Sequence, residues 1–248
     1  MIFLRSLFFW LLVCLITIPV GLLLVLFALL PLYTRFAIVG AWRTCFMWLA
    51  RWVLGVRMVV KGRENIPEKP VLVLAKHQSA WETVALQAIF KPLVFVLKKE
   101  LLKIPFFGWG LASVRMIGID RNAGREALKQ MQEAGTERLA AGIWVLVFPE
   151  GTRVLPGERG HYKPGAAWLA TRTGTPVLPV AHNAGEIWPK KALAIHSGTI
   201  TVSIGPAIET AGLKDAEVNR RVEAWIEGEM RVLSPWRYPP QTASAESG

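Results

Sequence analysis

Cysteine is scarce in this sequence of 248 residues. The two cysteines, Cys14 and Cys45, lie in the hydrophobic N-terminal part, and neither belongs to a Cys-x-x-Cys pair. Two cysteines cannot build a disulfide framework, and a zinc site requires more ligands at closer spacing. His161, His182 and His196 are scattered without ligand spacing. We therefore expect no metal site and interpret these histidines as structural or surface residues.

Motifs of enzymes that use a covalent nucleophile are also lacking. There is no Gly-x-Ser-x-Gly elbow, and no cysteine is placed beside a histidine. The segment Gly108-Trp109-Gly110 begins like a nucleotide-binding loop, but Ser113 occupies the position of its third glycine. The sequence therefore indicates neither a covalent intermediate nor a dinucleotide cofactor.

Acidic residues are few compared with basic ones. The chain has 18 Asp and Glu against 29 Lys and Arg, which gives a formal net charge of +11. A basic surface attracts nucleic acids, anionic lipid headgroups or phosphorylated substrates. No basic–aromatic motif for nucleic-acid recognition is present, and 52% of the residues are hydrophobic. We therefore expect a membrane lipid and a phosphorylated substrate as partners, and no nucleic acid.

A long uncharged run occupies the N-terminus. Residues 6–33 carry no charge, and a membrane-spanning helix needs only about 20 apolar residues. Residues 22–31 offer no convincing signal-peptide cleavage site. We predict a membrane anchor over residues 1–34. It is either one tilted helix or, because Pro19 and Gly21 permit a bend, a helical hairpin within one leaflet.

A second apolar stretch, residues 36–60, contains arginines alternating with tryptophans. They are Trp42, Arg43, Trp48, Arg51, Trp52 and Arg57. This pattern favours an interfacial amphipathic segment over residues 35–62, and an ordinary core helix with exposed arginines is the alternative. Only Arg5 precedes the uncharged run, whereas many basic residues follow it. The positive-inside rule thus places the remainder of the chain on the cytoplasmic side of a membrane, in a bacterium the inner membrane.

The rest of the chain alternates between strand and helix patterns. Continuous apolar runs, typical of buried parallel strands, occur at residues 71–75, 93–97 and 143–148, and shorter strands are expected at 114–119, 177–181 and 199–204. Helices are expected at residues 80–90, 107–112, 124–141, 164–173 (stopped by Gly174) and 214–233. This order predicts an α/β domain over residues 63–233, with a mostly parallel sheet flanked by helices. Residues 234–248 are predicted to be a disordered tail.

One polar segment follows the first strong strand, at the edge where α/β sheets carry their active sites. It reads Lys76-His77-Gln78-Ser79-Ala80-Trp81-Glu82. On a continuous helix, side chains five positions apart would lie roughly 140° apart. His77 and Glu82 can therefore meet only if His77 precedes the helix. Two explanations of Glu82 remain open: it assists His77 as a general base, or it closes a Ser79-x-x-Glu82 capping box.

Another polar segment follows the strand at 143–148. It reads Phe148-Pro149-Glu150-Gly151-Thr152-Arg153. An arginine on a glycine-containing turn can bind a phosphate through two hydrogen bonds. Glu150 has three open explanations: it orients Arg153, it contacts the acceptor, or it forms a structural salt bridge.

Four segments, in order, resemble the sequence blocks of the glycerolipid acyltransferase superfamily. The first is His77 to Glu82, similar to the family's His-x4-Asp signature. The others are residues 98–108 with Ile119-Asp120-Arg121, residues 148–153, and residues 175–180. The chain most resembles the 1-acylglycerol-3-phosphate acyltransferases. It departs from the pattern at Glu82, where the family has aspartate.

The resemblance implies an enzyme that transfers an acyl group from acyl-CoA or acyl-carrier protein to the sn-2 hydroxyl of lysophosphatidic acid, without a cofactor. His77 would be the general base and Glu82 its partner. The implied phosphate-binding residues are Lys98, Arg121, Glu150, Gly151, Thr152 and Arg153. Another lysophospholipid or lyso-aminolipid acceptor, or a non-catalytic lipid-binding role, remains an alternative, and nothing in the sequence indicates an oligomeric state.

Overall fold

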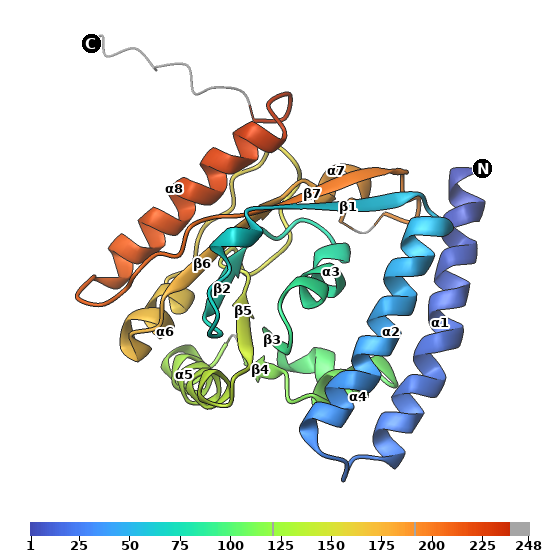
Figure 1. The fold of residues 1–248 in the computed structure, drawn as a ribbon, viewed down its shortest axis with the longest axis horizontal. Helices are drawn as coiled ribbons and strands as arrows, with labels where there is room; N and C mark the ends of the chain where they lie inside the picture. The colour runs from blue at the N-terminus through green and yellow to red at the C-terminus, as the bar shows by residue number, and fades with distance from the viewer. Residues whose placement is uncertain (121, 191, 239–248) are drawn as a thin grey trace.

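A seven-stranded sheet organises the chain in our computed structural model, which describes residues 1–120, 122–190 and 192–238 (Figure 1). The strand order is β1-β7-β6-β2-β5-β3-β4, and only the β6–β7 pair is antiparallel in the described sheet. The strands are β1 (Val56–Lys61), β2 (Leu72–Ala75), β3 (Leu93–Lys98), β4 (Ile117–Ile119), β5 (Trp144–Val147), β6 (Val177–His182) and β7 (Gly198–Ile204). The predicted mostly parallel sheet is therefore confirmed.

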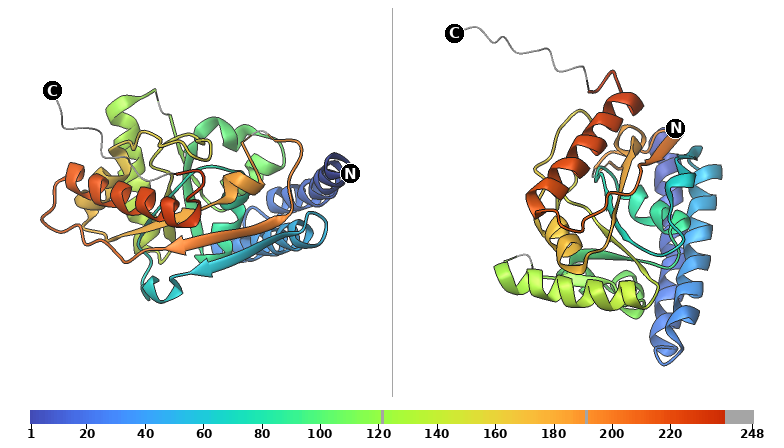
Figure 2. Two further views of the ribbon diagram at one scale, coloured as in Figure 1. Left: turned by 90° about the horizontal axis from the view of Figure 1, so that it is seen from above. Right: turned by 60° about the vertical axis from the view of Figure 1, so that its left-hand side comes forward.

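Helices cover both faces of this sheet (Figure 2). One layer contains α5 (Gly124–Ala140), α6 (Gly165–Thr173) and α8 (Asp215–Leu233). The other side holds α3 (Trp81–Ile89) and α4 (Phe107–Ser113), while α7 (Ala184–Ile187) is a short turn after β6. Because both faces are covered, every residue of β2, β5 and β6 is buried, as the continuous apolar runs predict for β2 and β5.

The N-terminal residues form two helices that lie side by side, α1 (Ile2–Leu26) and α2 (Leu32–Trp52) (Figure 1). Among the described helices, α1 alone is long and apolar enough to cross a membrane. One face of α1 is nevertheless buried against the protein. The ring of Phe9 lies 5.4 Å from that of Phe46 and 5.5 Å from that of Trp188. The anchor helix is thus packed along the domain rather than separated from it.

Close backbone contact holds the far part of α1 on α4. A Cβ atom added at Gly21 would lie 2.7 Å from the Cα and the carbonyl oxygen of Phe106, just before α4. Glycine is the one residue that fits so near another backbone. Gly21, which the sequence suggests as a bend in the anchor, serves instead as a packing site for helix against domain.

The amphipathic segment predicted over residues 35–62 needs a correction. Helix α2 ends at Trp52, Gly55 adopts a left-handed φ of +72°, and residues 56–61 form β1, paired in parallel with β7. Along β1 the more exposed side chains alternate with more buried ones. This two-residue period is that of a strand at the edge of a sheet. The segment therefore contributes a helix and an edge strand rather than one continuous helix.

The end of the described chain is packed on the domain. Residues 234–238, the first five of the predicted tail, form a turn in which Ser234 and Tyr238 are buried. The Gln78 side-chain amide donates a hydrogen bond of 2.8 Å to the Tyr238 hydroxyl. The remainder of the predicted tail, residues 239–248, lies outside the described residues.

Candidate active site

The predicted site residues follow the carboxyl ends of neighbouring parallel strands. His77 comes two residues after β2, Glu150 to Arg153 follow β5, and Lys98 is the last residue of β3. Since β2, β5 and β3 are adjacent and parallel, their carboxyl ends meet at one edge of the sheet. Arg121 lies outside the described residues.

His77 precedes α3, as the spacing argument requires. Its Nδ1 lies 2.8 Å from Oε1 of Glu82, which is in the first turn of that helix. The glutamate is fully buried, whereas 14% of the His77 side-chain surface is exposed. The longer side chain of glutamate, compared with the family's aspartate, therefore still reaches the imidazole.

Helix capping and imidazole binding occur at the same carboxylate oxygen. Oε1 of Glu82 accepts hydrogen bonds from the backbone N–H groups of Gln78, at 3.0 Å, and Ser79, at 2.8 Å, besides the one from His77. The Ser79 hydroxyl accepts the N–H of Trp81 at 3.1 Å. The two explanations of Glu82 are thus compatible, because the cap fixes the carboxylate that holds the histidine.

The environment of Glu82 keeps it ionised. Burial raises the pKa of a carboxyl group, but the hydrogen bond from His77, the nearby His182 and the hydrogen bond from the Ser79 N–H outweigh it, and the pKa of Glu82 is lowered. An ionised carboxylate only accepts hydrogen bonds, so Nδ1 of His77 carries the proton. The other ring nitrogen, Nε2, is then the basic one.

The backbone of His77 is bound to the segment that carries Arg153. Its N–H donates to Oε2 of Glu150 at 2.7 Å, and its carbonyl accepts the N–H of Val154 at 2.9 Å. The imidazole also stacks on the ring of Phe148, with 3.9 Å between the ring centroids. The histidine loop and the turn after β5 therefore form one packed unit.

An apolar cavity begins at His77. Its lining includes His77, Lys98 and Arg153, together with residues from α1, α2 and α4, among them Val20, Leu24, Val39, Trp42, Phe107 and Leu111. The cavity thus brings one basic nitrogen and two cations next to a surface suited to hydrocarbon. Glu82 and Glu150 are buried behind this lining, Thr152 is exposed, and Gly151 turns the chain with a φ of +66°.

Comparison with known proteins identifies the family. A model of the Acyltransferase family matches residues 57–183, about half of the chain. The chain belongs to this family.

Similar proteins extend the match to most of the chain. It is 49% identical to the 1-acyl-sn-glycerol-3-phosphate acyltransferase of Pseudomonas aeruginosa, over 84% of this chain and 82% of that protein. It is 30% identical to the enzyme of that name from Saccharomyces cerevisiae, over 79% of this chain and 66% of that protein. The crystal structure of PlsC from Thermotoga maritima, a 1-acyl-sn-glycerophosphate acyltransferase, superposes with a TM-score of 0.78 at 26% identity, covering 93% of this chain and 95% of that one.

Sequence reasoning missed several polar residues buried around the site of this acyltransferase. They are Lys76, Tyr162, His182 and Glu227. Lys76 is fully buried between Glu150 and Glu227, and Nε2 of His182 donates to its carbonyl oxygen at 2.8 Å. One signal was available: Lys76 is a charged residue directly after an uninterrupted apolar strand, where a buried position needs a partner.

Proposed function

We propose that this acyltransferase moves a fatty acyl group from an acyl-CoA or acyl-carrier-protein thioester to the sn-2 hydroxyl of 1-acylglycerol-3-phosphate, forming phosphatidic acid. The names of its relatives suggest the acceptor. The observation that carries the proposal is one cavity that joins the basic His77 to the cations of Lys98 and Arg153 and to an apolar wall. An acceptor with a hydroxyl, a phosphate and an acyl chain fits those three features.

His77 supplies the base in this proposal. An alcohol is a weak nucleophile at neutral pH, so Nε2 of His77 removes the hydroxyl proton as the oxygen attacks the thioester carbonyl. Glu82 holds Nδ1 and stabilises the imidazolium. When the intermediate collapses, the carbon–sulfur bond breaks and the proton passes from His77 to the leaving thiolate. Such proton transfer contributes about 10²–10⁴-fold to the rate.

Phosphate recognition is assigned to the cations at the cavity. The Arg153 guanidinium can bind two phosphate oxygens, and Lys98 adds a second positive charge. Arg121 remains a proposed phosphate ligand, because it directly follows β4 and Asp120. The turn of Gly151 and Thr152 presents backbone and hydroxyl groups at the same edge of the sheet. Glu150 contributes indirectly, because its carboxylate accepts the His77 N–H and so holds the turn to the histidine loop.

The anchor explains how a lipid acceptor reaches this cavity. α1 has buried residues from Ser6 to Leu24 on the face toward the domain and exposed leucines, isoleucines and phenylalanines elsewhere. A helix held along a domain in this way cannot cross a bilayer apart from it. We therefore propose that the α1–α2 hairpin lies in one leaflet, the cytoplasmic leaflet of a bacterial inner membrane, with the active site at the headgroup level.

The test is an acceptor panel with purified protein in vesicles, comparing lysophosphatidic acid with lysophosphatidylcholine, lysophosphatidylethanolamine and a lyso-aminolipid. We expect lysophosphatidic acid to have the highest kcat/KM. His77→Ala should lower kcat by about 10³-fold, whereas the exposed control His196→Ala should match the wild type. A preference for another acceptor would refute the assigned substrate. Unchanged turnover in His77→Ala would refute the assigned base.

A further inference from the structure

Lys76 is a fully buried lysine that is not among the residues lining the cavity. Its Nζ lies 2.7 Å from Oε1 of Glu150 and 2.7 Å from Oε1 of Glu227, and 3.4 Å from the carbonyl oxygen of Glu158. Lysine is almost never fully buried unless it is paired. Here one ammonium group joins the loop after β2, the turn after β5 and helix α8.

Glu150 connects this ammonium group to the proposed base. One carboxylate oxygen pairs with Lys76, and the other accepts the backbone N–H of His77 at 2.7 Å. Glu150 also lies in the turn after β5, three residues before Arg153. Together with the hydrogen bond from the Val154 N–H to the His77 carbonyl, this carboxylate therefore ties the backbone of His77 to the segment that carries Arg153.

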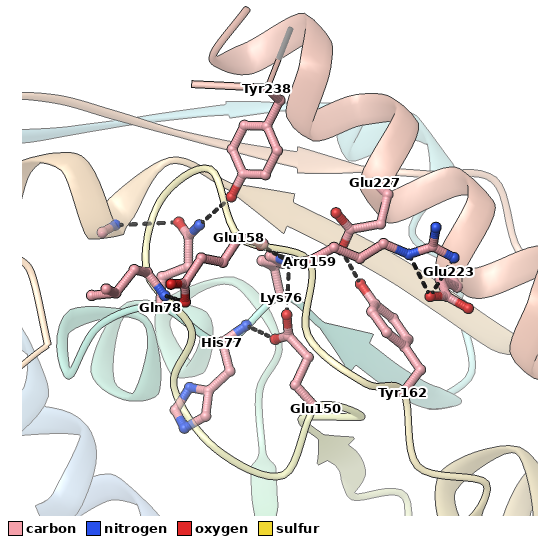
Figure 3. Close-up of polar contacts among 12 residues, drawn as sticks. Lys76, His77, Gln78, Glu150, Glu158, Arg159, Tyr162, Glu223, Glu227 and Tyr238 are labelled. Carbon is pink, nitrogen blue, oxygen red and sulfur yellow. Dashed lines mark hydrogen bonds and ion pairs between the residues drawn. The ribbon is translucent and has the colours of Figure 1, made fainter. Parts of the chain in front are cut away.

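Glu227 fixes the other side of the ammonium group. It lies on α8, and its Oε1 also accepts a hydrogen bond of 2.9 Å from the Tyr162 hydroxyl. Figure 3 shows Lys76 and Glu150 beside the backbone of His77, and Glu227 and Tyr162 further toward α8. Because α8 is a long helix packed on β6 and α6, these residues are attached to a rigid part of the fold.

Electrostatics indicate that Glu150 depends on Lys76. Burial raises the pKa of Glu150 to about 7, and the nearby Lys76 ammonium opposes this rise. For Lys76, burial lowers the pKa, but the two carboxylates outweigh it and leave the pKa raised. Lys76 is thus charged, and without it the pKa of Glu150 would rise further, so that Glu150 would be largely protonated at neutral pH and a weaker acceptor for the His77 N–H.

We propose that Lys76 is a positioning residue for acyl transfer, which sets the geometry between His77 and Arg153 through the Glu150 carboxylate. This inference rests on the proposed function. Lys76 does not touch the substrate; it acts through Glu150, and Glu227 holds it in place. The alternative is an ion pair that only stabilises the fold.

The two roles differ in the kinetic constants that they change. A misplaced base lowers kcat, and a misplaced Arg153 raises the KM for the phosphate-bearing acceptor. A destabilised but otherwise intact enzyme loses active molecules, so its apparent kcat falls while the KM of each substrate stays the same. The acceptor KM, compared with the donor KM, therefore separates positioning from stability.

The experiment measures steady-state kinetics of Lys76→Met with lysophosphatidic acid and an acyl-CoA, together with its folded fraction by circular dichroism. We expect kcat to fall by about 10–100-fold and the acceptor KM to rise, with the donor KM unchanged. The control is Glu223→Gln on α8, which removes the exposed ion pair with Arg159 at 2.8 Å. It should leave all three constants as in the wild type.

A second variant protects the test against misfolding. Lys76→Met leaves two buried carboxylates without their cation, whereas Lys76→Met with Glu227→Gln removes one of them. The double variant should show the same rise in acceptor KM. In the His77→Ala background, Lys76→Met should not lower the residual kcat further, since the base through which it acts is gone.

Wild-type kinetic constants in both Lys76 variants, or a loss that only follows the folded fraction with unchanged KM values, would overturn the inference. Failure of the proposed function looks different, because the wild-type enzyme itself would not acylate lysophosphatidic acid.

Discussion

His77 stands between two regions of opposite character. On the α8 side, Lys76, Glu150 and Glu227 form a buried charged cluster with distances of 2.7 Å. On the α1 side, the cavity wall is largely apolar, and α1 has no charged side chain after Arg5. Charged groups in fixed pairs hold a backbone in one position. Apolar contacts are non-directional, so the cavity wall tolerates chains of differing shape.

The comparison shows which side chains of this fold need an exact position and which do not. In the proposed mechanism, proton transfer needs His77 within hydrogen-bond reach of a hydroxyl, and the polar side fixes the backbone of that histidine. A hydrocarbon chain needs only an apolar surface, which helices α1, α2 and α4 provide. Substitutions on the polar side should therefore change rates strongly, whereas those on the lipid-facing side should change membrane binding mildly.

The largest effect is expected at Glu82. Glu82→Gln removes the charge that stabilises the imidazolium and that sets the proton on Nδ1, so kcat should fall on the order of 10³-fold. The control is Glu82→Asp, which keeps the charge and matches the family pattern, and should lose less than about tenfold. Steady-state assays with lysophosphatidic acid measure both. Equal activity of the Gln and Asp variants would show that the charge is irrelevant and that Glu82 only caps α3.

An intermediate effect concerns the pH dependence of stability through Glu150. Its pKa in the folded protein is raised from the model-compound value of 4.5 to about 7, so between these values the folded state binds more protons than the unfolded state. Stability from this group is therefore lost as pH rises from about 4.5 to about 7, by at most about 3 kcal/mol. The lowered pKa of Glu82 affects stability below pH 4.5 and the raised pKa of Lys76 affects it above pH 10.5, so neither contributes between pH 4.5 and 7.

The measurement is the Tm of wild type and Glu150→Gln in detergent across pH 4.5 to 8. Over that range the wild-type Tm should fall relative to the variant, and the two curves should become parallel by about pH 8, one unit above the pKa of Glu150. A constant difference between the two curves would mean that Glu150 titrates normally and that the polar cluster is not desolvated.

The smallest effect is expected on the exposed apolar surface of α2, which we propose faces the membrane. Trp48 and Trp52 of α2 have 58% and 66% of their surface exposed. Replacing both with serine should weaken binding to anionic vesicles by about tenfold, with kcat on micellar substrate unchanged. The control is Trp236→Ser, a tryptophan with 68% exposure that follows α8. A large loss of kcat in the α2 variant would contradict the idea that catalysis depends on the charged cluster and tolerates changes on the apolar side.

Local patterns predicted most of the fold and the core of the site. The apolar run before Lys76 predicted β2. Because His77 and Glu82 cannot meet on one continuous helix at a spacing of five residues, the sequence also placed His77 in the loop before α3. Both inferences depend on residues near one another in sequence. The residues of β1 were predicted to continue an interfacial amphipathic segment, because the preceding tryptophans and arginines resemble an interfacial helix. The alternation of buried and more exposed side chains along β1 was therefore overlooked.

The charged cluster could not be predicted, because its partners are remote in sequence. Lys76 and Glu227 are separated by 151 positions, and Glu227 appears in the sequence as one of many acidic residues on a surface helix. Only the packing of α8 on β6 brings them together. A charged residue after an apolar strand predicts that some partner exists, but the fold decides which residue it is.

One consequence follows from α1 being both a wall of the cavity and the most exposed apolar helix. With α1 in one leaflet, as we propose, a fatty chain would exchange between bilayer and cavity along this helix without passing through water. Detergent tails have the same chemistry, so we expect them to enter by the same route and to compete with the natural chains. Activity after solubilisation should consequently depend on the length of the surfactant alkyl group, and nanodiscs are the preferable medium for kinetics.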